Sequence, residues 1–110
     1  QTRSVIGEDE DKQSDMNSLM DGRLKAELYS NIPNPFKEQT TISFFIPETA
    51  YGASIHIYNL QGKQIKQINI GERGNGSVII NGYELTPGMY MYTLIVDGKE
   101  IDTKKMILTE

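Results

Sequence analysis

Few side chains in this sequence are of the types that carry out catalysis. The chain has no cysteine, which excludes a thiol nucleophile, a disulfide and a thiolate metal site. Its single histidine, His56, lies between Ile55 and Ile57 and is expected to point away from both, as an ordinary strand residue does. A Ser-His-Asp set would depend on that one imidazole, and the chain has no Gly-x-Ser-x-Gly motif. These residues predict no catalytic site.

Two further stretches have the composition of ligand-binding loops but lack the spacing. The segment from Gly71 to Gly76 is rich in glycine, yet it lacks the Gly-Lys-Ser/Thr end of a phosphate-binding loop. It is expected to be a loop between strands. The acidic run from Glu8 to Asp11 lacks the alternating ligands, central glycine and closing glutamate of a calcium loop. We therefore predict that the chain is not an enzyme and holds no cofactor or metal.

The charge balance limits the partners. With 15 acidic and 11 basic residues the net charge is -4, which argues against binding to nucleic acid or to an anionic membrane. The sequence contains no apolar run of the length that spans a bilayer, so no transmembrane segment is expected.

Exposed aromatic residues and lysines leave two alternatives open. Tyr29, Tyr51 and Tyr83 lie near expected turns and could stack on sugars, although scattered surface tyrosines are the favoured interpretation. Lysines cluster on the last expected strand, at positions 99, 104 and 105. Such charges can protect an edge strand or bind a partner, and the sequence does not separate these roles.

The elements that would position these residues are strands. From residue 28 onward, apolar and polar residues alternate over short runs, which is the period of half-buried strands. Ile42, Phe44 and Ile46 share one expected face, and the phase slips between Ile65 and Ile68, which predicts a β-bulge. The expected strands are Thr41–Ile46, Ile55–Tyr58, Lys63–Ile70, Ser77–Ile80, Met89–Val96 and Ile101–Leu108.

Turn residues lie between these runs. Asp97-Gly98 is the strongest signal and predicts a two-residue type I′ hairpin that joins the last two strands. Further turns are expected at Gln61-Gly62, Asn75-Gly76 and Asn81-Gly82.

Tyr90 enters a late strand just after Pro87-Gly88, which is the arrangement of a tyrosine corner. Its hydroxyl is expected to bond to backbone a few residues upstream. About seven short strands and this corner predict an all-β, immunoglobulin-like antiparallel β-sandwich, with a small barrel as the alternative.

Several segments together resemble a known family. Leu28 to Phe36, with the sequence LYSNIPNPF, is similar to the opening motif of the type A C-terminal sorting domain of the type IX secretion system. The segments TTISF at 40–44, IYNLQGK at 57–63, LTPGMY at 85–90, DGK at 97–99 and KMILT at 105–109 resemble its later motifs in the same order. The resemblance covers about residues 26–110, with residues 1–25 expected to be an acidic linker from an upstream passenger.

The resemblance implies a function. Such domains direct exported proteins of Bacteroidetes-type bacteria through the periplasm and across the outer membrane, to the cell surface or the extracellular space. Implied partners are the translocon, a shuttle outer-membrane protein, a sortase that can remove the domain, and the passenger in the same chain. The alternative is a structural or adhesive immunoglobulin-like module, which could bind carbohydrate. The residues that match the recognition and export motifs are Pro33, Asn34, Pro35, Phe36, Tyr58, Gly62, Lys63, Gly88, Tyr90, Gly98, Lys99 and Lys105.

Overall fold

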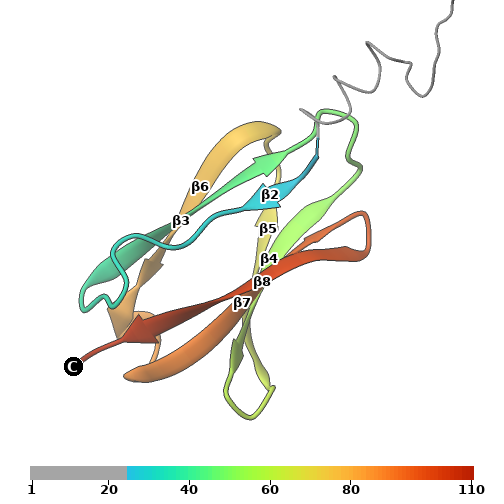
Figure 1. Cartoon of the computed structure of the whole chain (residues 1–110). Helices are drawn as coiled ribbons and strands as arrows, with labels where there is room; N and C mark the ends of the chain where they lie inside the picture. The colour runs from blue at the N-terminus through green and yellow to red at the C-terminus, as the bar shows by residue number, and fades with distance from the viewer. Residues whose placement is uncertain (1–24) are drawn as a thin grey trace, which may run out of the picture.

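The computed structural model describes residues 25–110, which form two antiparallel sheets packed face to face (Figure 1). The first sheet has the order β2-β3-β6, with β2 at Glu27–Leu28, β3 at Gln39–Ile46 and β6 at Gly74–Asn81. The second has the order β5-β4-β7-β8, with β4 at Ala53–Asn59, β5 at Gln64–Ile70, β7 at Gly88–Val96 and β8 at Lys99–Leu108. A short 3₁₀ helix, η1 at Gly82–Glu84, follows β6.

This architecture confirms the expected immunoglobulin-like sandwich, because the strands form two separate sheets and not a barrel. The linker expected at residues 1–25 lies outside the described residues, apart from Lys25.

The core lies between the sheets and is built by the expected alternation. Ile42, Phe44 and Ile46 of β3 are buried against Ile55 and Ile57 of β4. Every second residue of β7 from Tyr90 to Val96 is also buried. Burying one such side chain contributes roughly 1.5–3 kcal/mol, so these alternating residues are what hold the two sheets together.

The bulge predicted near Ile65 is confirmed. Ile57 lies opposite Lys66, whereas the next residue, Tyr58, lies opposite Gln64. Ile65 is therefore left without a partner on β4, and its side chain is 41% exposed. The extra residue reverses the alternation, which accounts for the slip in the isoleucine pattern.

The turn expected at Asn75-Gly76 is wrong, and β6 is longer than the predicted Ser77–Ile80. The strand begins at Gly74, and Gly76 lies within it opposite Phe44. A Cβ atom on Gly76 would lie 2.8 Å from Cε1 of Phe44. Glycine stands here because an aromatic ring covers it. Part of the glycine-rich segment is thus strand, and the connection from β5 is confined to residues 71–73.

The type I′ hairpin between β7 and β8 is confirmed. Asp97 and Gly98 have φ angles of 52° and 80°, and Val96 pairs with Lys99 across the two-residue loop. A β-branched residue is strongly disfavoured in this left-handed region.

Replacing Gly98 with valine is expected to lower the free energy of unfolding by about 1–2 kcal/mol. The melting temperature should fall by several degrees in a thermal denaturation followed by circular dichroism. Lys99→Val, one residue further on and in regular strand, is the control and should change stability by less than about 0.5 kcal/mol. An unchanged melting temperature for Gly98→Val would contradict the type I′ turn.

The tyrosine corner is also confirmed. The Tyr90 hydroxyl donates a hydrogen bond to the backbone oxygen of Thr86 at 2.5 Å, and the Thr86 Oγ1 lies 3.2 Å from the same hydroxyl. This bond holds the connection that carries the chain from β6 in one sheet to β7 in the other. Within residues 25–110, no helix has the length and apolar character needed to cross a membrane.

Candidate functional site

The residues that match the sorting motifs lie at the two opposite ends of the sandwich. The entry end is where β2 begins, next to the close of β3 and the β7–β8 turn. The exit end holds the C-terminus, the β4–β5 turn and the start of β7 (Figure 1). Gly98 and Lys99 lie at the entry end, because they belong to the β7–β8 turn. The matched residues that the fold places toward the exit end are Pro33, Asn34, Pro35, Phe36, Tyr58, Gly62, Lys63, Gly88, Tyr90 and Lys105.

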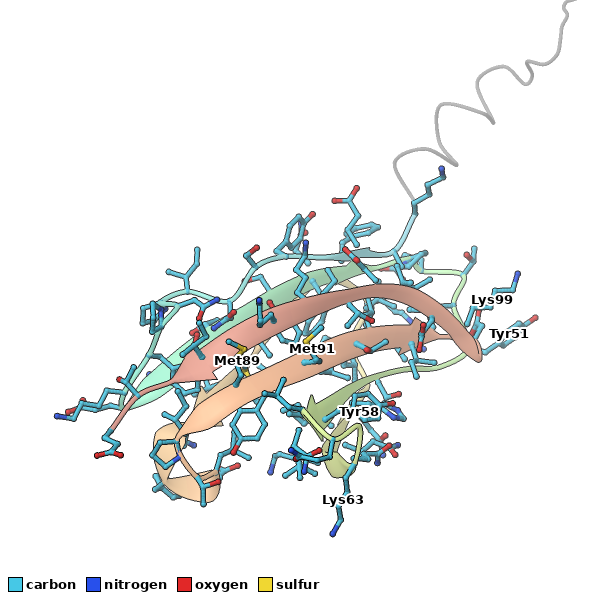
Figure 2. The ribbon with its side chains drawn as sticks, turned by 60° about the horizontal axis from the view of Figure 1, so that its bottom comes forward. Tyr51, Tyr58, Lys63, Met89, Met91 and Lys99 are labelled. Atoms are coloured by element: carbon cyan, nitrogen blue, oxygen red, sulfur yellow. The ribbon has the colours of Figure 1, made fainter. Side chains whose placement is uncertain are left out.

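The β4–β5 turn, which contains Gly62 and Lys63, is organised by Asn59. The Asn59 Oδ1 accepts hydrogen bonds from the backbone N–H groups of Gln61 and Lys63 at 3.0 and 2.9 Å. The Asn59 backbone also bonds to Gly62 and to Lys63. These bonds fix a tight turn whose tip points into solvent, with the Leu60 side chain 61% exposed. The asparagine of the IYNLQGK segment thus sets the geometry of the turn that carries Leu60 and Lys63. Figure 2 shows Lys63 extending from this turn.

Two motif segments distant in sequence meet beside this turn and form a groove of about 270 Å³, which we call the turn groove. One wall comes from the β4–β5 turn and the other from the connection that the tyrosine corner holds. Three of its apolar side chains, Leu60, Ile65 and Met89, are exposed by 61%, 41% and 38%. The lining residues are Asn59, Leu60, Gln61, Ile65, Thr86, Pro87, Gly88, Met89 and Tyr90.

The outer face of the four-stranded sheet continues from the turn groove. Tyr58 and Lys105 pair with Met91 from either side, so these three residues form one row across β4, β7 and β8. Met89 is on the same face as Met91, and Figure 2 shows both methionines and Tyr58 on this side of the ribbon. An apolar strip with a lysine at its border is a surface that suits a protein partner.

The Asn-Pro-Phe motif closes the free edge of β8 near the C-terminus. Asn34 acts as a strand mimic, since its Oδ1 accepts a bond from the Ile107 N–H at 3.0 Å and its Nδ2 donates to the Lys105 oxygen at 3.2 Å. Phe36 continues the pairing through bonds with Ile107 and Thr109, and its ring is buried. Pro33 and Pro35 flank Asn34 and are exposed. The matched motif at the domain start therefore protects the last strand.

Asp97 connects two loops at the entry end. Its Oδ1 accepts bonds from the Tyr51 and Gly52 N–H groups at 2.7 and 2.9 Å, which joins the β7–β8 turn to the β3–β4 loop. Arg73 donates to the Ala50 oxygen at 3.1 Å and so attaches the β5–β6 loop to the same place. The Lys99 side chain extends from this end into solvent (Figure 2).

The three tyrosines considered for sugar stacking do not converge. Tyr51 lies at the entry end and is 95% exposed, while Tyr83 lies on η1 at the exit end and is 85% exposed. The Tyr29 hydroxyl donates to the Glu27 carboxylate at 2.8 Å, and this bond raises the pKa of Tyr29. The three rings lie at separate places, so together they form no shared aromatic platform.

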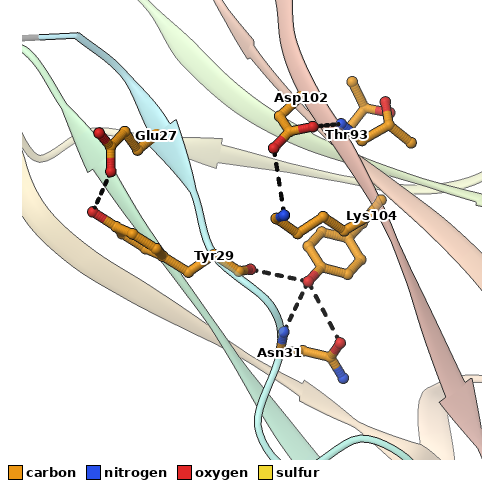
Figure 3. A network of polar contacts seen from close by, with 8 residues as sticks. Glu27, Tyr29, Asn31, Thr93, Asp102 and Lys104 are labelled. Atoms are coloured by element: carbon orange, nitrogen blue, oxygen red, sulfur yellow. Dashed lines mark hydrogen bonds and ion pairs between the residues drawn. The ribbon is translucent and has the colours of Figure 1, made fainter.

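A buried hydroxyl joins β7 to the segment that leads into the Asn-Pro-Phe motif. The Tyr92 hydroxyl accepts a bond from the Asn31 N–H at 2.8 Å and donates to the Tyr29 oxygen at 3.0 Å (Figure 3). The Asn31 side chain donates in turn to Thr40 at 3.0 Å. Burial raises the pKa of Tyr92, with the Asn31 contact acting in the opposite direction.

An ion pair joins β5 to η1. Lys66 of β5 lies 2.9 Å from the Glu84 carboxylate of η1. The Lys66 contact, with a second one from Asn81, lowers the pKa of Glu84. Neither residue is among those that line the turn groove.

His56 occupies the outer face, as its position between two buried isoleucines predicts. Its ring nitrogens lie 2.9 Å from Ser54 Oγ and 3.0 Å from Gln64 Oε1. Across residues 25–110, no three histidine, aspartate or glutamate side chains gather closely enough to hold a metal ion.

Sequence reasoning did not single out Asn31, Asn59, Leu60 or Met89 as site residues. The sequence feature that could have indicated this site is the apolar Leu60 at the tip of an expected turn, since turns are usually polar. The role of Asn31 depends on a contact with a residue 61 positions away, which no local pattern indicates.

Comparison with known proteins agrees with the motif pattern. The profile of a family described as "Secretion system C-terminal sorting domain" matches residues 30–109. No curated protein matches the chain. Among solved structures, a protein titled "Biofilm associated protein - BSP domain" is similar at a TM-score of 0.54 and 13% identity, over 76% of this chain and 15% of that chain. The alkylpurine DNA glycosylase AlkC from Pseudomonas fluorescens gives a TM-score of 0.44 at 15% identity, over 90% of this chain and 34% of that chain. The chain thus spans well under half of both structures, and the first likeness concerns the fold alone.

Proposed function

The chain belongs to the type IX secretion C-terminal sorting domain family, and from this membership we propose that the outer-membrane translocon and its shuttle protein read the folded surface of the sandwich. Membership itself makes the domain an export signal for a passenger in the same chain, which is carried to the cell surface or the extracellular space. The proposal concerns which surface is read, and which components read it.

The observation that supports the turn groove as the recognition surface is the meeting of two matched motifs there. Gly62 and Lys63 belong to one motif and Gly88 and Tyr90 to another, and the fold brings both to the exit end. Each glycine has a backbone role, yet the exposed apolar side chains beside them have no packing role in the sandwich. Exposed Leu60 and Met89 on a folded tag are explained by a partner that covers them.

In this arrangement the proposed recognition surface and the expected cleavage position lie at opposite ends of the domain. Residue 25, where the described chain begins, leads into β2 at the entry end, whereas the turn groove lies at the exit end. A sortase that cuts ahead of residue 26 would then work at the end away from the groove. The shuttle protein could hold the domain while the passenger is released from it, and transit through the periplasm would precede both steps.

We further propose that the domain is not itself an enzyme. The only imidazole is engaged by Ser54 and Gln64 on the outer face, and the exposed polar groups of the groove belong to a turn and not to an acid-base pair. Any catalysis in the exported protein is left to the passenger.

The test is export of a reporter. Residues 26–110 are fused behind a periplasmic reporter in a bacterium that has a type IX system, and reporter at the surface and in the medium is measured against the periplasmic fraction. We expect the fusion to leave the periplasm, as a fusion to an established sorting domain does in the same strain. Retention of this fusion, while the established domain is exported, would overturn the proposal.

A further inference from the structure

The four edge strands of the two sheets differ in how they are protected against pairing with another chain. Native proteins protect sheet edges with short strands, charges, bulges or covering loops. The first edge, β2, is only two residues long. The second, β5, carries Lys66 and the bulge at Ile65.

The third edge, β8, is long but has the other three kinds of protection. It carries five charged residues in its ten-residue sequence KEIDTKKMIL, and its register shifts opposite Leu94 and Ile95. Asn34 and Phe36 also bond to its backbone near the C-terminus.

Among residues 25–110, the fourth edge, β6, has none of these devices. Its sequence GNGSVIIN contains no charge and no proline, and it pairs with β3 without a register shift over eight residues. Ile79 is 55% exposed beside this edge. A long, regular, uncharged edge strand is the kind that accepts another strand.

The backbone groups that β6 offers can be identified. Gly82 donates to the Glu38 oxygen, so with this register the even-numbered residues of β6 bond to β3. On β3, the N–H and C=O of Thr41 bond to Ile32 on the opposite side, which agrees with this alternation. The N–H and C=O groups of Asn75, Ser77, Ile79 and Asn81 therefore face away from β3, on the side where the sheet ends.

We propose that β6 pairs antiparallel with β6 of a second copy of this chain, about a two-fold axis at Val78. In this register Ser77 lies opposite Ile79 of the second copy, and Asn75 lies opposite its Asn81. Both are pairs in which the outward N–H and C=O groups meet, so each copy satisfies the groups that the other presents. No like charges fall in directly opposed cross-strand pairs, because the strand itself has none.

A second copy of the chain is the partner that we infer for the β6 edge, because β6 is complementary to itself and the resulting dimer leaves no β6 edge free. Joining two β6 strands makes one continuous sheet in the order β2-β3-β6-β6-β3-β2, whose remaining edges are the two-residue β2 strands. Such an isologous contact ends at a dimer. None of the residues that line the turn groove belongs to β6, so this interface is separate from the proposed recognition surface.

A single cysteine tests the register. The chain has no cysteine, so the Val78→Cys variant carries a single thiol, at residue 78. Residue 78 meets its own copy as a non-hydrogen-bonded pair with Cα atoms about 4.5 Å apart, within the range that a disulfide spans. We expect mild oxidation of the full chain bearing Val78→Cys to give a covalent dimer on a non-reducing gel. Ile68→Cys, also half-buried but on β5, is the matched control and should run as a monomer on the same gel, because its thiols do not meet in the paired dimer.

Sedimentation equilibrium supplies the independent measurement. Wild-type protein should show a monomer–dimer equilibrium, and Ile79→Lys should weaken it about fivefold, since two lysines then lie diagonally across the axis. Gln67→Lys, an exposed position on β5, should leave it unchanged. A wild-type protein that stays monomeric, or folded Val78→Cys that does not cross-link, would overturn the proposal. Association that continues beyond a dimer would also overturn it, because the two-fold pairing closes.

Discussion

Replacing Tyr92 with phenylalanine is expected to lower the free energy of unfolding by about 2–3 kcal/mol at neutral pH. The ring stays in the core, where it is fully buried, so packing is retained and only the hydroxyl is lost. The buried Asn31 N–H then loses its acceptor and the Tyr29 oxygen loses its donor. A buried polar group without a partner costs more than the bond itself contributed, which is why one oxygen atom has this effect.

The effect of Tyr92→Phe should depend on pH in a definite direction. Burial raises the pKa of Tyr92 in the folded state above its ordinary value of 10.0. The unfolded chain therefore loses this proton first, and the stability linked to it is complete below about pH 10 and is lost as pH rises toward the folded pKa. Wild-type protein should lose stability more steeply than Tyr92→Phe above about pH 10, and the difference between them should narrow.

Urea denaturation at about pH 7 and at about pH 11 measures both effects. Tyr83→Phe is the matched control, because Tyr83 is 85% exposed and its hydroxyl has no hydrogen-bond partner among residues 25–110. It should change stability by less than about 0.5 kcal/mol. A Tyr92→Phe variant as stable as wild type at neutral pH would show that the hydroxyl does not join β7 to the Asn31 segment.

Local sequence patterns predicted much of this fold because many of its features depend on residues that are close together in the chain. Alternation placed Ile42, Phe44 and Ile46 in the core, and Asp97-Gly98 gave the correct turn type. Even the tyrosine corner of Tyr90 closes over only four residues. Each of these features depends on residues close in sequence, where period and turn chemistry are read directly.

The features that could not be predicted depend on contacts between distant residues. Asn75-Gly76 has the sequence of a turn, but the Phe44 ring, 32 positions earlier, requires the glycine within a strand. Asn34 was recognised only as part of a motif, and its use as a strand mimic on β8 needs a partner 73 positions away. The turn groove likewise exists only after the corner brings Met89 beside Leu60. The motifs indicate separate segments of the chain, and only the fold shows that two of these segments lie side by side at the turn groove.

Replacing Leu60 with glutamate is expected to reduce export of a fused passenger about tenfold or more while the domain stays folded. Leu60 is 61% exposed at a turn that Asn59 holds, so its side chain contributes little to stability. Full burial of a leucine by a partner contributes about 1.5–3 kcal/mol, and each 1.4 kcal/mol is a factor of ten in affinity. A charge at this position adds a desolvation cost to that loss. Export of the reporter fusion, measured as the surface and medium fraction, reports the change.

The control must separate the turn groove from exposed apolar surface in general. Ile79→Glu is matched, because Ile79 is 55% exposed and lies on β6, outside the groove. It should disturb pairing between copies and leave export intact, while Leu60→Met should restore export because it returns an apolar side chain of similar size. Equal loss of export in Ile79→Glu and Leu60→Glu would assign recognition to a property of the whole surface. Normal export of Leu60→Glu would show that Leu60 does not belong to the recognition surface. Loss of export in that variant alone would place the partner over the turn groove, where the tyrosine corner and the Asn59 turn bring the two motifs together.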